Sequence, residues 1–396
     1  MNNKVLDLSN TSFKGELLNS PLPFIKGWTS NLYLHQMESI VEVLTKGSGV
    51  LKLTTGTGKT RIIAELCRKT QVKHILVVVS KIDLLVQIND VLVDYLKDTN
   101  LTITTIGDGN KYPIWANITV GLVGTLTKIN NLDLIDYVIY DECHKYINQS
   151  GIDLYNMLVN VKCITALSAT PYTEDVETNN LITKLYGPLL YELTEKQAIA
   201  LGCISTPKIN IYKAPIGYCS RKFINCTFSN FAYNKQIDSL IINNKGRNDL
   251  IVELVQLDKS TVIIVNKVNT EKNNHAVILK DLIEKAYPHK LVYIVKGGDT
   301  KGLSSISNPN CILIAGPNII TEGTDMPSLE VVVLAAANSS PTLLLQRVGR
   351  VLRKSFTKTY GEVIDFIDPI GWPASQSKKR IDTYTEVYGK ENIVFH

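Results

Sequence analysis

The sequence predicts an α/β protein in which two successive units are each built on a doubly wound parallel sheet. Short apolar runs rich in valine and isoleucine alternate with longer amphipathic stretches through most of the 396 residues. Uninterrupted apolar runs are typical of strands buried on both faces, and the stretches between them are typical of crossover helices. The same rhythm returns after an interruption in the middle of the chain, and the length is sufficient for two domains with separate cores.

The individual elements follow from this rhythm. Strand–helix–strand alternation indicates parallel sheets with helices on their faces. The runs that we expect as strands are residues 49–53, 74–79, 137–140, 164–167, 261–265, 311–315 and 330–335. The stretches that we expect as helices are residues 60–69, 83–97, 247–257 and 274–286.

The interruption at residues 206–245 predicts where the two units join. It contains Pro207, Pro215 and Gly217, which break regular elements, so we expect a linker and an irregular lead into the second unit. The expected organisation is an N-terminal extension at 1–28, a first domain at 29–208 and a second domain at 209–396. The stretch is also rich in aromatic residues, namely Tyr212, Tyr218, Phe223, Phe228, Phe231 and Tyr233.

The composition narrows the class of protein. A net charge of +5 permits nucleic acid as a partner without requiring it. The seven cysteines form no CxxC pair, and Cys219 and Cys226 have no further cysteine or histidine nearby, so we expect free thiols and no zinc site. The polar N-terminus and the absence of an apolar run of about 18 residues predict a soluble, cytoplasmic protein.

A phosphate-binding loop is predicted at Thr55-Gly56-Thr57-Gly58-Lys59-Thr60, between an expected strand and an expected helix. Glycines let successive backbone N–H groups point at phosphate oxygens, Lys59 is placed to reach the β- and γ-phosphates, and the Thr60 hydroxyl to ligate Mg²⁺. Leu53 stands where the usual pattern has its first glycine. An ordinary glycine-rich turn is the alternative, which the strand–loop–helix context disfavours.

An acidic pair, Asp141 and Glu142, ends the apolar run at 137–140. Ligands bind at the carboxyl ends of parallel strands, so Asp141 is expected to hold Mg²⁺ and Glu142 to orient and deprotonate a water molecule. An acidic helix N-cap is the alternative, and the loop upstream favours catalysis. His144 is expected to sense the γ-phosphate or to link the two units, with a surface histidine as the alternative.

Arginines recur near the end of the second unit, in Gln346-Arg347-Val348-Gly349-Arg350-Val351-Leu352-Arg353. Guanidinium groups suit the spread charge of a transferring phosphoryl group, so these arginines are candidates to reach the phosphates from the second unit. The resemblance described below implies that Gln346, Arg350 and Arg353 face the nucleotide. Arg347 is expected in a salt bridge or at the surface. A merely solvated helix face is the alternative for the whole segment.

Taken in order, these motifs resemble those of superfamily 2 helicases of the DExH type. The resemblance runs from about residue 32 to 368. The segments that carry it are the phosphate loop, Asp141-Glu142-Cys143-His144, Ser168-Ala169-Thr170, Val78-Val79-Ser80-Lys81, Val123-Gly124-Thr125, residues 261–266, residues 319–327 and residues 346–353.

The resemblance implies two tandem RecA-like domains with the ATP site in the cleft between them, and ATP and Mg²⁺ as cofactors. It implies that Gln36 reads the adenine edge, although Tyr33 stands where an arginine is common. Ser168 and Thr170 would couple hydrolysis to movement of the units, and Gly323 and Asp325 would line the cleft opposite the phosphate loop. The nucleic-acid contacts it implies are Ser80, Lys81, Gly124, Thr125, Asn266 and Thr321.

Within the superfamily, the sequences of the motifs look most like those of the restriction-type and XPB/UvsW-like branch, which includes phage branch-migration helicases. We therefore expect an ATP-dependent helicase or translocase that acts on branched or duplex DNA without sequence preference. The same engine on RNA, a duplex translocase that separates no strands, and an ATP-gated clamp are the alternatives. The short segment before Gln36 is expected to hold no sizeable DNA-binding module, and the oligomeric state stays open, a monomer being compatible.

Overall fold

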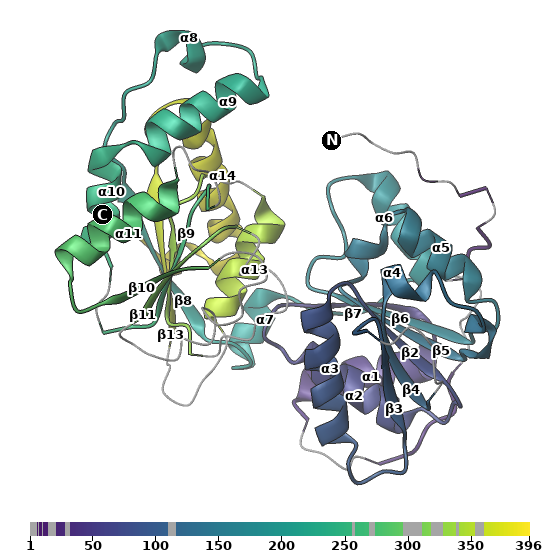
Figure 1. Cartoon of the computed structure of the whole chain (residues 1–396). Helices are drawn as coiled ribbons and strands as arrows, with labels where there is room; N and C mark the ends of the chain where they lie inside the picture. The colour runs from purple at the N-terminus through teal and green to yellow at the C-terminus, as the bar shows by residue number, and fades with distance from the viewer. Residues whose placement is uncertain are drawn as a thin grey trace. The chain divides into compact units, whose positions relative to one another are not determined.

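The computed structural model describes two compact units, Met1–Thr194 and Glu195–His396 (Figure 1). Each unit contains a seven-stranded sheet in which the paired strands run parallel. The described residues are 6, 8–9, 11–14, 21–27, 32–109, 116–255, 258–268, 274–295, 311–317, 328–337, 340–352 and 360–396, without the side chains of Thr342 and Gln346.

The sheet of the first unit has the strand order β3-β4-β2-β5-β6-β1-β7. Its central strands are apolar on both faces, as a sheet sandwiched between helices requires. The strands are β1 (Gly49–Leu53), β2 (Ile75–Val79), β3 (Ile103–Ile106), β4 (Ile118–Leu122), β5 (Tyr137–Asp141), β6 (Cys163–Ser168) and β7 (Leu189–Leu193).

Helices cover both faces of this sheet. Helices α1 (Leu34–Lys46), α2 (Lys59–Lys69) and α3 (Ile82–Tyr95) lie on one face, and α4 (Val123–Leu126), α5 (Gln149–Met157) and α6 (Val176–Tyr186) on the other (Figure 1). Under the second group, apolar side chains of α5 and α6 pack on Val50, Val78 and Tyr140 from strands β1, β2 and β5. Short 3₁₀ turns, η1 (Leu132–Leu134) and η2 (Cys143–Tyr146), flank β5.

The sheet of the second unit has the order β10-β11-β9-β12-β13-β8-β14. Its strands are β8 (Thr206–Lys213), β9 (Thr261–Ile264), β10 (Leu291–Val295), β11 (Cys311–Ala315), β12 (Val331–Leu334), β13 (Tyr360–Ile367) and β14 (Ile393–Phe395). The accompanying helical elements are α7 (Glu195–Ala200), α8 (Arg221–Ile224), α9 (Asn230–Gln236), the π-helical turn η3 (Ile237–Ile242), α10 (Lys245–Glu253), α11 (His275–Ala286), α13 (Pro341–Val351), α14 (Gly371–Tyr388) and η5 (Lys390–Asn392).

The expected strands and helices are confirmed, with ends that differ by a few residues. The expected linker at 206–245 is wrong over its first part. Residues Thr206–Lys213 form β8, which pairs with β13 along its whole length and with β14 on its other side. Proline is tolerated near the start of a strand, where Pro207 lies, so it ends no element here. The chain accordingly divides between Thr194 and Glu195 rather than after residue 208.

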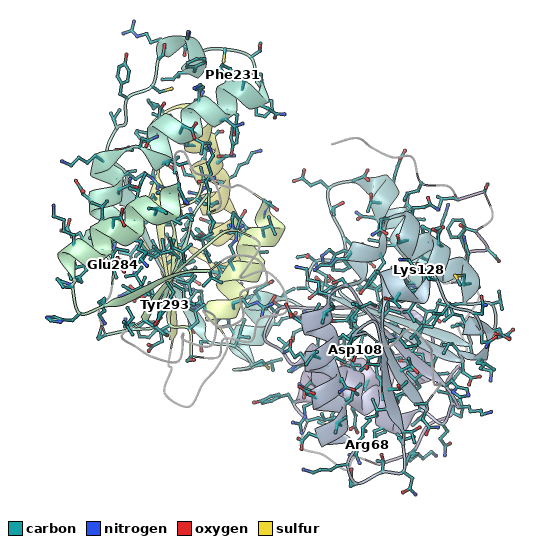
Figure 2. The ribbon with its side chains drawn as sticks, viewed as in Figure 1. Arg68, Asp108, Lys128, Phe231, Glu284 and Tyr293 are labelled. Carbon is teal, nitrogen blue, oxygen red and sulfur yellow. The ribbon has the colours of Figure 1, made fainter. Side chains whose placement is uncertain are left out.

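No helix in the described part of the chain is both long enough and apolar enough to cross a lipid bilayer. The arrangement of all side chains in the described ranges is drawn in Figure 2.

A buried ion pair joins β13 to the long helix α14. Asp365 accepts hydrogen bonds from Nε and Nη2 of Arg380, each at 2.9 Å, and from the Tyr384 hydroxyl at 2.8 Å. Asp365 and Arg380 are at most 2% exposed. Burial opposes the charge on Arg380, but the Asp365 carboxylate outweighs it and raises the pKa of the guanidinium. Because both charges are dehydrated, each depends on the other.

We expect Arg380→Ala to lower the free energy of unfolding of the second unit by about 3–5 kcal/mol, since it leaves the Asp365 carboxylate buried without its cation. The exposed pair Lys280–Glu284, with Nζ and Oε1 3.5 Å apart, gives the control. Lys280→Ala should change the free energy by at most about 0.5 kcal/mol. Calorimetry and urea unfolding followed by circular dichroism measure both. Equal losses in the two variants would contradict the assignment.

Candidate active site

The predicted site residues of the first unit meet at the carboxyl edge of its sheet. Strands β5, β6 and β1 are direct neighbours, and Asp141 is opposite Leu167 in the register while Lys52 is opposite Ser168. Since all three strands point the same way, the segments that follow them emerge side by side. Residues far apart in the chain are thereby brought together at one edge.

The phosphate loop is held open by two left-handed glycines. Gly56 has φ 87° and Gly58 has φ 84°, and Gly58 directly precedes the first residue of α2. Successive N–H groups in such a loop form a concave anion site at the positive end of the helix. The Thr57 hydroxyl donates to the Thr54 carbonyl at 2.7 Å, which closes the loop on itself.

Lys59 is fixed between the strand and the acidic pair. Its Nζ donates to the Leu53 carbonyl at 3.2 Å and lies 3.5 Å from Glu142 Oε1. Leu53, which departs from the usual glycine, is the last residue of β1 and is fully buried. Leu53 therefore takes part in the sheet, and its carbonyl holds the Lys59 ammonium group at the start of the loop.

The two carboxylates of the acidic pair have different environments. Burial and the adjacent Glu142 charge raise the pKa of Asp141 to about 7. Burial also opposes ionisation of Glu142, but Lys59, and after it His144 and Lys145, outweigh it and lower the pKa of Glu142. Glu142 is therefore a carboxylate at neutral pH, the form that accepts a proton.

Glu142 has an unusual backbone conformation for a non-glycine residue, with φ 53° and ψ 56°. Such a conformation costs about 1–3 kcal/mol and survives only where the surroundings enforce it. It lies where the chain passes from the buried strand β5 into η2.

A hydrogen-bonded chain connects Glu142 to the segment after β6. The Ser168 hydroxyl donates to Glu142 Oε2 at 3.2 Å, and His144 Nδ1 lies 2.8 Å from the same hydroxyl. The Thr170 N–H donates to Ser168 Oγ at 3.0 Å. His144 therefore belongs to this series of hydrogen bonds and is not a surface histidine. Within the described ranges the Thr170 hydroxyl is buried and has no hydrogen-bond partner.

Gln36 lies against the phosphate loop, with both ends of its amide engaged. Its Nε2 donates to the Thr57 carbonyl at 3.0 Å, and its Oε1 accepts from the Tyr33 N–H at 3.1 Å. His35, which the sequence analysis passed over, has Nε2 at 2.9 Å from the same Thr57 carbonyl. Its place beside Gln36 at the start of α1 was the only signal available in the sequence.

The predicted metal donors fit Mg²⁺ in one respect. Mg²⁺ is usually held by one or two protein oxygens together with waters and substrate phosphates. Thr60, in the first turn of α2 after the phosphate loop, and Asp141, at the end of β5, supply oxygens of this kind. No group of three or more histidine, cysteine or acidic side chains that could hold a metal ion occurs among the described residues.

The residues expected to contact nucleic acid in the first unit follow the neighbouring strands of the same edge. Ser80 and Lys81 lie between β2 and α3, and Gly124 and Thr125 lie in α4 directly after β4. The Ser80 hydroxyl is buried without a hydrogen-bond partner within the described part of the chain.

Two predicted residues of the second unit have side chains that hydrogen-bond to the backbone. Asn266 makes a double hydrogen bond with one backbone unit, since its Nδ2 donates to the Ala337 carbonyl at 3.2 Å and its Oδ1 accepts from the Ala337 N–H at 2.9 Å. Arg347 is 2% exposed and donates to the Pro317 carbonyl at 3.3 Å. Its expected surface position is wrong, because α13 turns this side chain inward. Burial lowers the pKa of Arg347 to about 10.

Arg350 is buried in α13. The other predicted residues of the second unit, and the side chain of Gln346, lie outside the part of the chain that the structure describes. They are Thr321, Gly323, Asp325 and Arg353.

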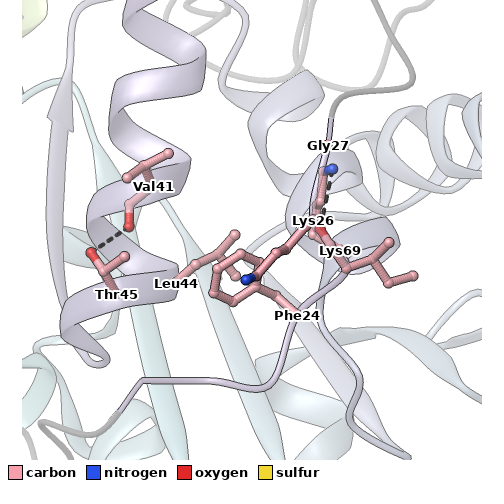
Figure 3. Close-up of a pocket in the computed structure, with 8 residues that line it drawn as sticks. Phe24, Lys26, Gly27, Val41, Leu44, Thr45 and Lys69 are labelled. Carbon is pink, nitrogen blue, oxygen red and sulfur yellow. Dashed lines mark hydrogen bonds between the residues drawn. The ribbon is translucent and has the colours of Figure 1, made fainter.

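An apolar pocket of about 250 Å³ also occurs in the first unit. Phe24, Val41, Leu44 and the stem of Lys69 line it (Figure 3). It lies along the C-terminal half of α1, whereas Gln36 and the phosphate loop are at the N-terminal end of that helix. The pocket is therefore separate from the candidate active site.

Two family models match the chain. The model of the type III restriction enzyme res subunit matches residues 29–173, and the model of the helicase conserved C-terminal domain matches residues 246–355.

Among curated proteins, the ATP-dependent DNA helicase uvsW of Enterobacteria phage T4 is 27% identical over 364 residues, which cover 87% of this chain and 70% of that protein. A protein of Acanthamoeba polyphaga mimivirus, L396, whose name proposes an ATP-dependent RNA helicase, is 24% identical over 363 residues. These residues cover 86% of this chain and 65% of the mimivirus protein.

Solved structures share the fold. Dbp5 of S. cerevisiae, bound to RNA and ADP BeF3, has a TM-score of 0.64 at 15% identity and covers 93% of this chain and 90% of its own. The type ISP restriction-modification enzyme LlaBIII, bound to DNA, has a TM-score of 0.60 at 16% identity, over 93% of this chain and 30% of its own. The two parallel sheets are thus tandem RecA-like domains.

We expect Gly58→Ala to destabilise the first unit by about 1–2 kcal/mol, because an L-residue is disfavoured at positive φ. Its Cβ would also lie 2.5 Å from Gln36 Nε2 and displace the amide from the Thr57 carbonyl. Gly124→Ala is the control, since nothing lies within 4 Å of a Cβ there and its φ is not positive. Thermal melting of both variants tests this, and a Gly58→Ala protein as stable as Gly124→Ala would contradict it.

Proposed function

We propose that this chain moves on branched or duplex DNA and remodels it. The chain is a superfamily 2 helicase that resembles the UvsW-like and restriction-type branch, and it is hence an ATP-dependent enzyme. The observation that carries the proposal is the contiguous chain from Lys59 through Glu142 to Ser168 and Thr170. It joins the residues proposed to bind and hydrolyse ATP to a segment proposed to respond to hydrolysis.

In the proposed reaction, the backbone N–H groups of residues 55–58 bind phosphate oxygens and Lys59 neutralises their charge. Mg²⁺, held by Thr60 and Asp141, would supply further positive charge at the phosphates. Glu142, ionised beside Lys59, orients the attacking water and accepts its proton. Gln36 is proposed to contact adenine once its amide gives up a hydrogen bond to Thr57 or Tyr33 and bonds to the edge of the base instead.

The hydrogen bonds around Ser168 suggest how hydrolysis is reported. Glu142 Oε2, His144 Nδ1 and the Thr170 N–H all meet the Ser168 hydroxyl. A proton gained by Glu142 changes which of these groups can donate, so the segment after β6 responds to the state of the base. We propose that this response couples chemistry to motion.

In the second unit, we propose that Gln346, Arg350 and Arg353 stabilise the transferring phosphoryl group, and that Gly323 and Asp325 contribute to the nucleotide site. Guanidinium groups in this role are worth on the order of 10³–10⁵ in rate.

Nucleic acid is proposed to bind through Ser80, Lys81, Gly124, Thr125 and Thr321. Contacts from hydroxyls, small residues and backbone grip phosphates without reading sequence, and they make binding salt-dependent. Asn266, whose amide is committed to Ala337, is proposed to position the segment after β12 rather than to contact DNA directly.

The preference for DNA rests on the similarity to uvsW, a DNA helicase whose alignment covers 87% of this chain. The mimivirus protein supports RNA as the second candidate. The 2′-hydroxyl separates the two possibilities, because it is the group that a protein can use to distinguish RNA from DNA.

We expect ATP turnover to be stimulated by DNA more than by RNA of equal length, and most by forked or Holliday-type DNA. Phosphate release measured with forked, four-way, linear duplex and single-stranded DNA and with RNA tests this. Greater stimulation by RNA would favour the second candidate, and no stimulation by any nucleic acid would contradict the proposal. A strand-displacement assay on the same panel separates a helicase from a translocase that leaves the duplex closed.

We expect Glu142→Gln to lower the turnover number for ATP by about 10²–10⁴-fold, because the amide cannot accept the proton of water. Nucleotide affinity, measured by isothermal calorimetry, should persist since Lys59 and the loop are intact. Glu192→Gln is the control, a half-exposed carboxylate of the same unit that pairs with Lys52 at 2.7 Å. Unchanged turnover in Glu142→Gln would show that the base is elsewhere.

A further inference from the structure

The second unit carries a cluster of aromatic and basic side chains that the proposed chemistry does not use. It lies on α8, α9 and the first turn of α14, and Phe231 is labelled among the side chains on α9 in Figure 2. We call it the aromatic–basic surface. Its members are Phe223, Phe228, Phe231, Tyr233, Trp372, Arg221, Lys222 and Lys235.

Two rings of this surface are exposed, and each contacts a less exposed ring. Phe228 is 66% exposed and Phe231 is 64% exposed. Phe228 meets Trp372 edge to face at 5.2 Å between centroids, and Phe231 meets Phe223 in the same way at 5.9 Å. The ring contacts form two groups, Phe223 with Phe231 and Phe228 with Tyr233 and Trp372, each of which presents one exposed ring on the same short stretch of chain. Exposed aromatic rings gathered in this way are candidates for a binding surface.

Positive charge accompanies the rings. Lys222 Nζ lies 4.9 Å from the Phe223 ring centroid, and Lys235 Nζ lies 5.6 Å from that of Phe231. Residues 214–237 contain Arg221, Lys222 and Lys235 and no aspartate or glutamate. The surface is therefore complementary to a partner that carries negative charge.

Hydrogen bonds between α9 and α14 support one side of the surface. Gln236 at the end of α9 accepts from the Trp372 N–H at 2.8 Å, and Gln376 donates to the Tyr233 hydroxyl at 3.2 Å. Gly371, with φ 72°, lets the two helices approach, because a Cβ there would lie 2.3 Å from Gln236 Oε1. These contacts fix Tyr233 and the start of α14, against which the Phe228 ring packs.

The surface is connected to the carboxyl edge of the second sheet. Helix α14 begins shortly after β13 ends, and Lys267, just after β9, pairs with Asp238 of η3 at 2.5 Å. Asn266 lies at this edge too, directly before Lys267. The aromatic–basic surface is therefore linked through the Lys267–Asp238 ion pair to the carboxyl edge of the second sheet.

We propose that the aromatic–basic surface binds single-stranded DNA by stacking unpaired bases on Phe228 and Phe231, while Arg221, Lys222 and Lys235 contact the phosphates. Exposed rings interleaved with cations are the means by which proteins hold single strands without sequence preference. The inference rests on the proposed function and adds to it a place for the strand that leaves the duplex. Exposed polar neighbours such as Asn230 and Asn234 suit base edges better than they suit an apolar protein partner.

Binding of a 5′-labelled oligothymidylate, followed by fluorescence anisotropy at fixed salt, tests the proposal on the full chain. Phe228→Ala with Phe231→Ala should weaken binding by about tenfold or more, as expected when base stacking is lost. Phe228→Tyr with Phe231→Tyr should retain binding, since the rings remain. The control is Phe395→Ala, an aromatic residue of the same unit that is 59% exposed on β14 and should leave binding unchanged.

The basic residues provide a second, independent measurement. Lys222→Ala with Lys235→Ala should reduce the dependence of log affinity on log salt by about one to two units, because each lost phosphate contact removes nearly one. The alanine variants of the two phenylalanines should weaken binding while leaving this slope unchanged. A folded protein in all cases is verified by circular dichroism.

The outcomes separate this inference from the proposed function. Loss of oligothymidylate binding in the phenylalanine variants, with duplex-stimulated ATP turnover retained, supports the surface. Unchanged oligothymidylate binding in the phenylalanine variants overturns the inference about the surface. The proposed function still stands in that case if DNA stimulates ATP turnover. If an RNA oligomer binds as tightly as DNA and the same variants lose that binding, the choice of DNA is overturned. If the protein self-associates and the variants abolish the self-association, a nucleic-acid role of the surface is overturned.

Discussion

The parallel direction of the strands in each sheet is the constraint on which the rest of this structure depends. Because β1, β5 and β6 end at one edge, the phosphate loop, the acidic pair and the Ser168 segment meet without any long connection. The second sheet obeys the same rule, so Asn266 and the start of α14 lie near its corresponding edge. A sheet with mixed directions would scatter these residues over two opposite edges.

Electrostatics then determines how the grouped residues behave. Lys59 faces the partly buried carboxylate of Glu142 and lowers its pKa, while burial and the like charge of Glu142 raise the pKa of the adjacent Asp141. The left-handed backbone at Glu142 marks the point where the chain leaves β5 for η2. The fold therefore provides two chemically distinct acids from one dipeptide, which is what a metal ligand and a general base require.

Much of the fold and of the nucleotide site could be predicted because it depends on local patterns. Gly49–Leu53 and Cys311–Ala315 are strands as expected, since continuous apolar runs have few alternatives in a parallel sheet. The role of β8 could not be predicted, because its pairing with β13 is a long-range interaction that Pro207 does not reveal. The double hydrogen bond of Asn266, the inward Arg347 and the amide contacts of Gln36 are likewise tertiary, and no spacing in the sequence encodes them.

One consequence concerns thiol chemistry. Cys143 stands between the proposed base and His144, yet it is fully buried, and burial raises the pKa of its thiol well above the usual value. The thiolate is the reactive form, so alkylating and oxidising reagents have little to attack beside Asp141 and Glu142. Cys203 and Cys226 are the partly accessible thiols of the described residues. A maleimide probe would therefore report on the second unit, and Cys226 would place it in the α8–α9 connection.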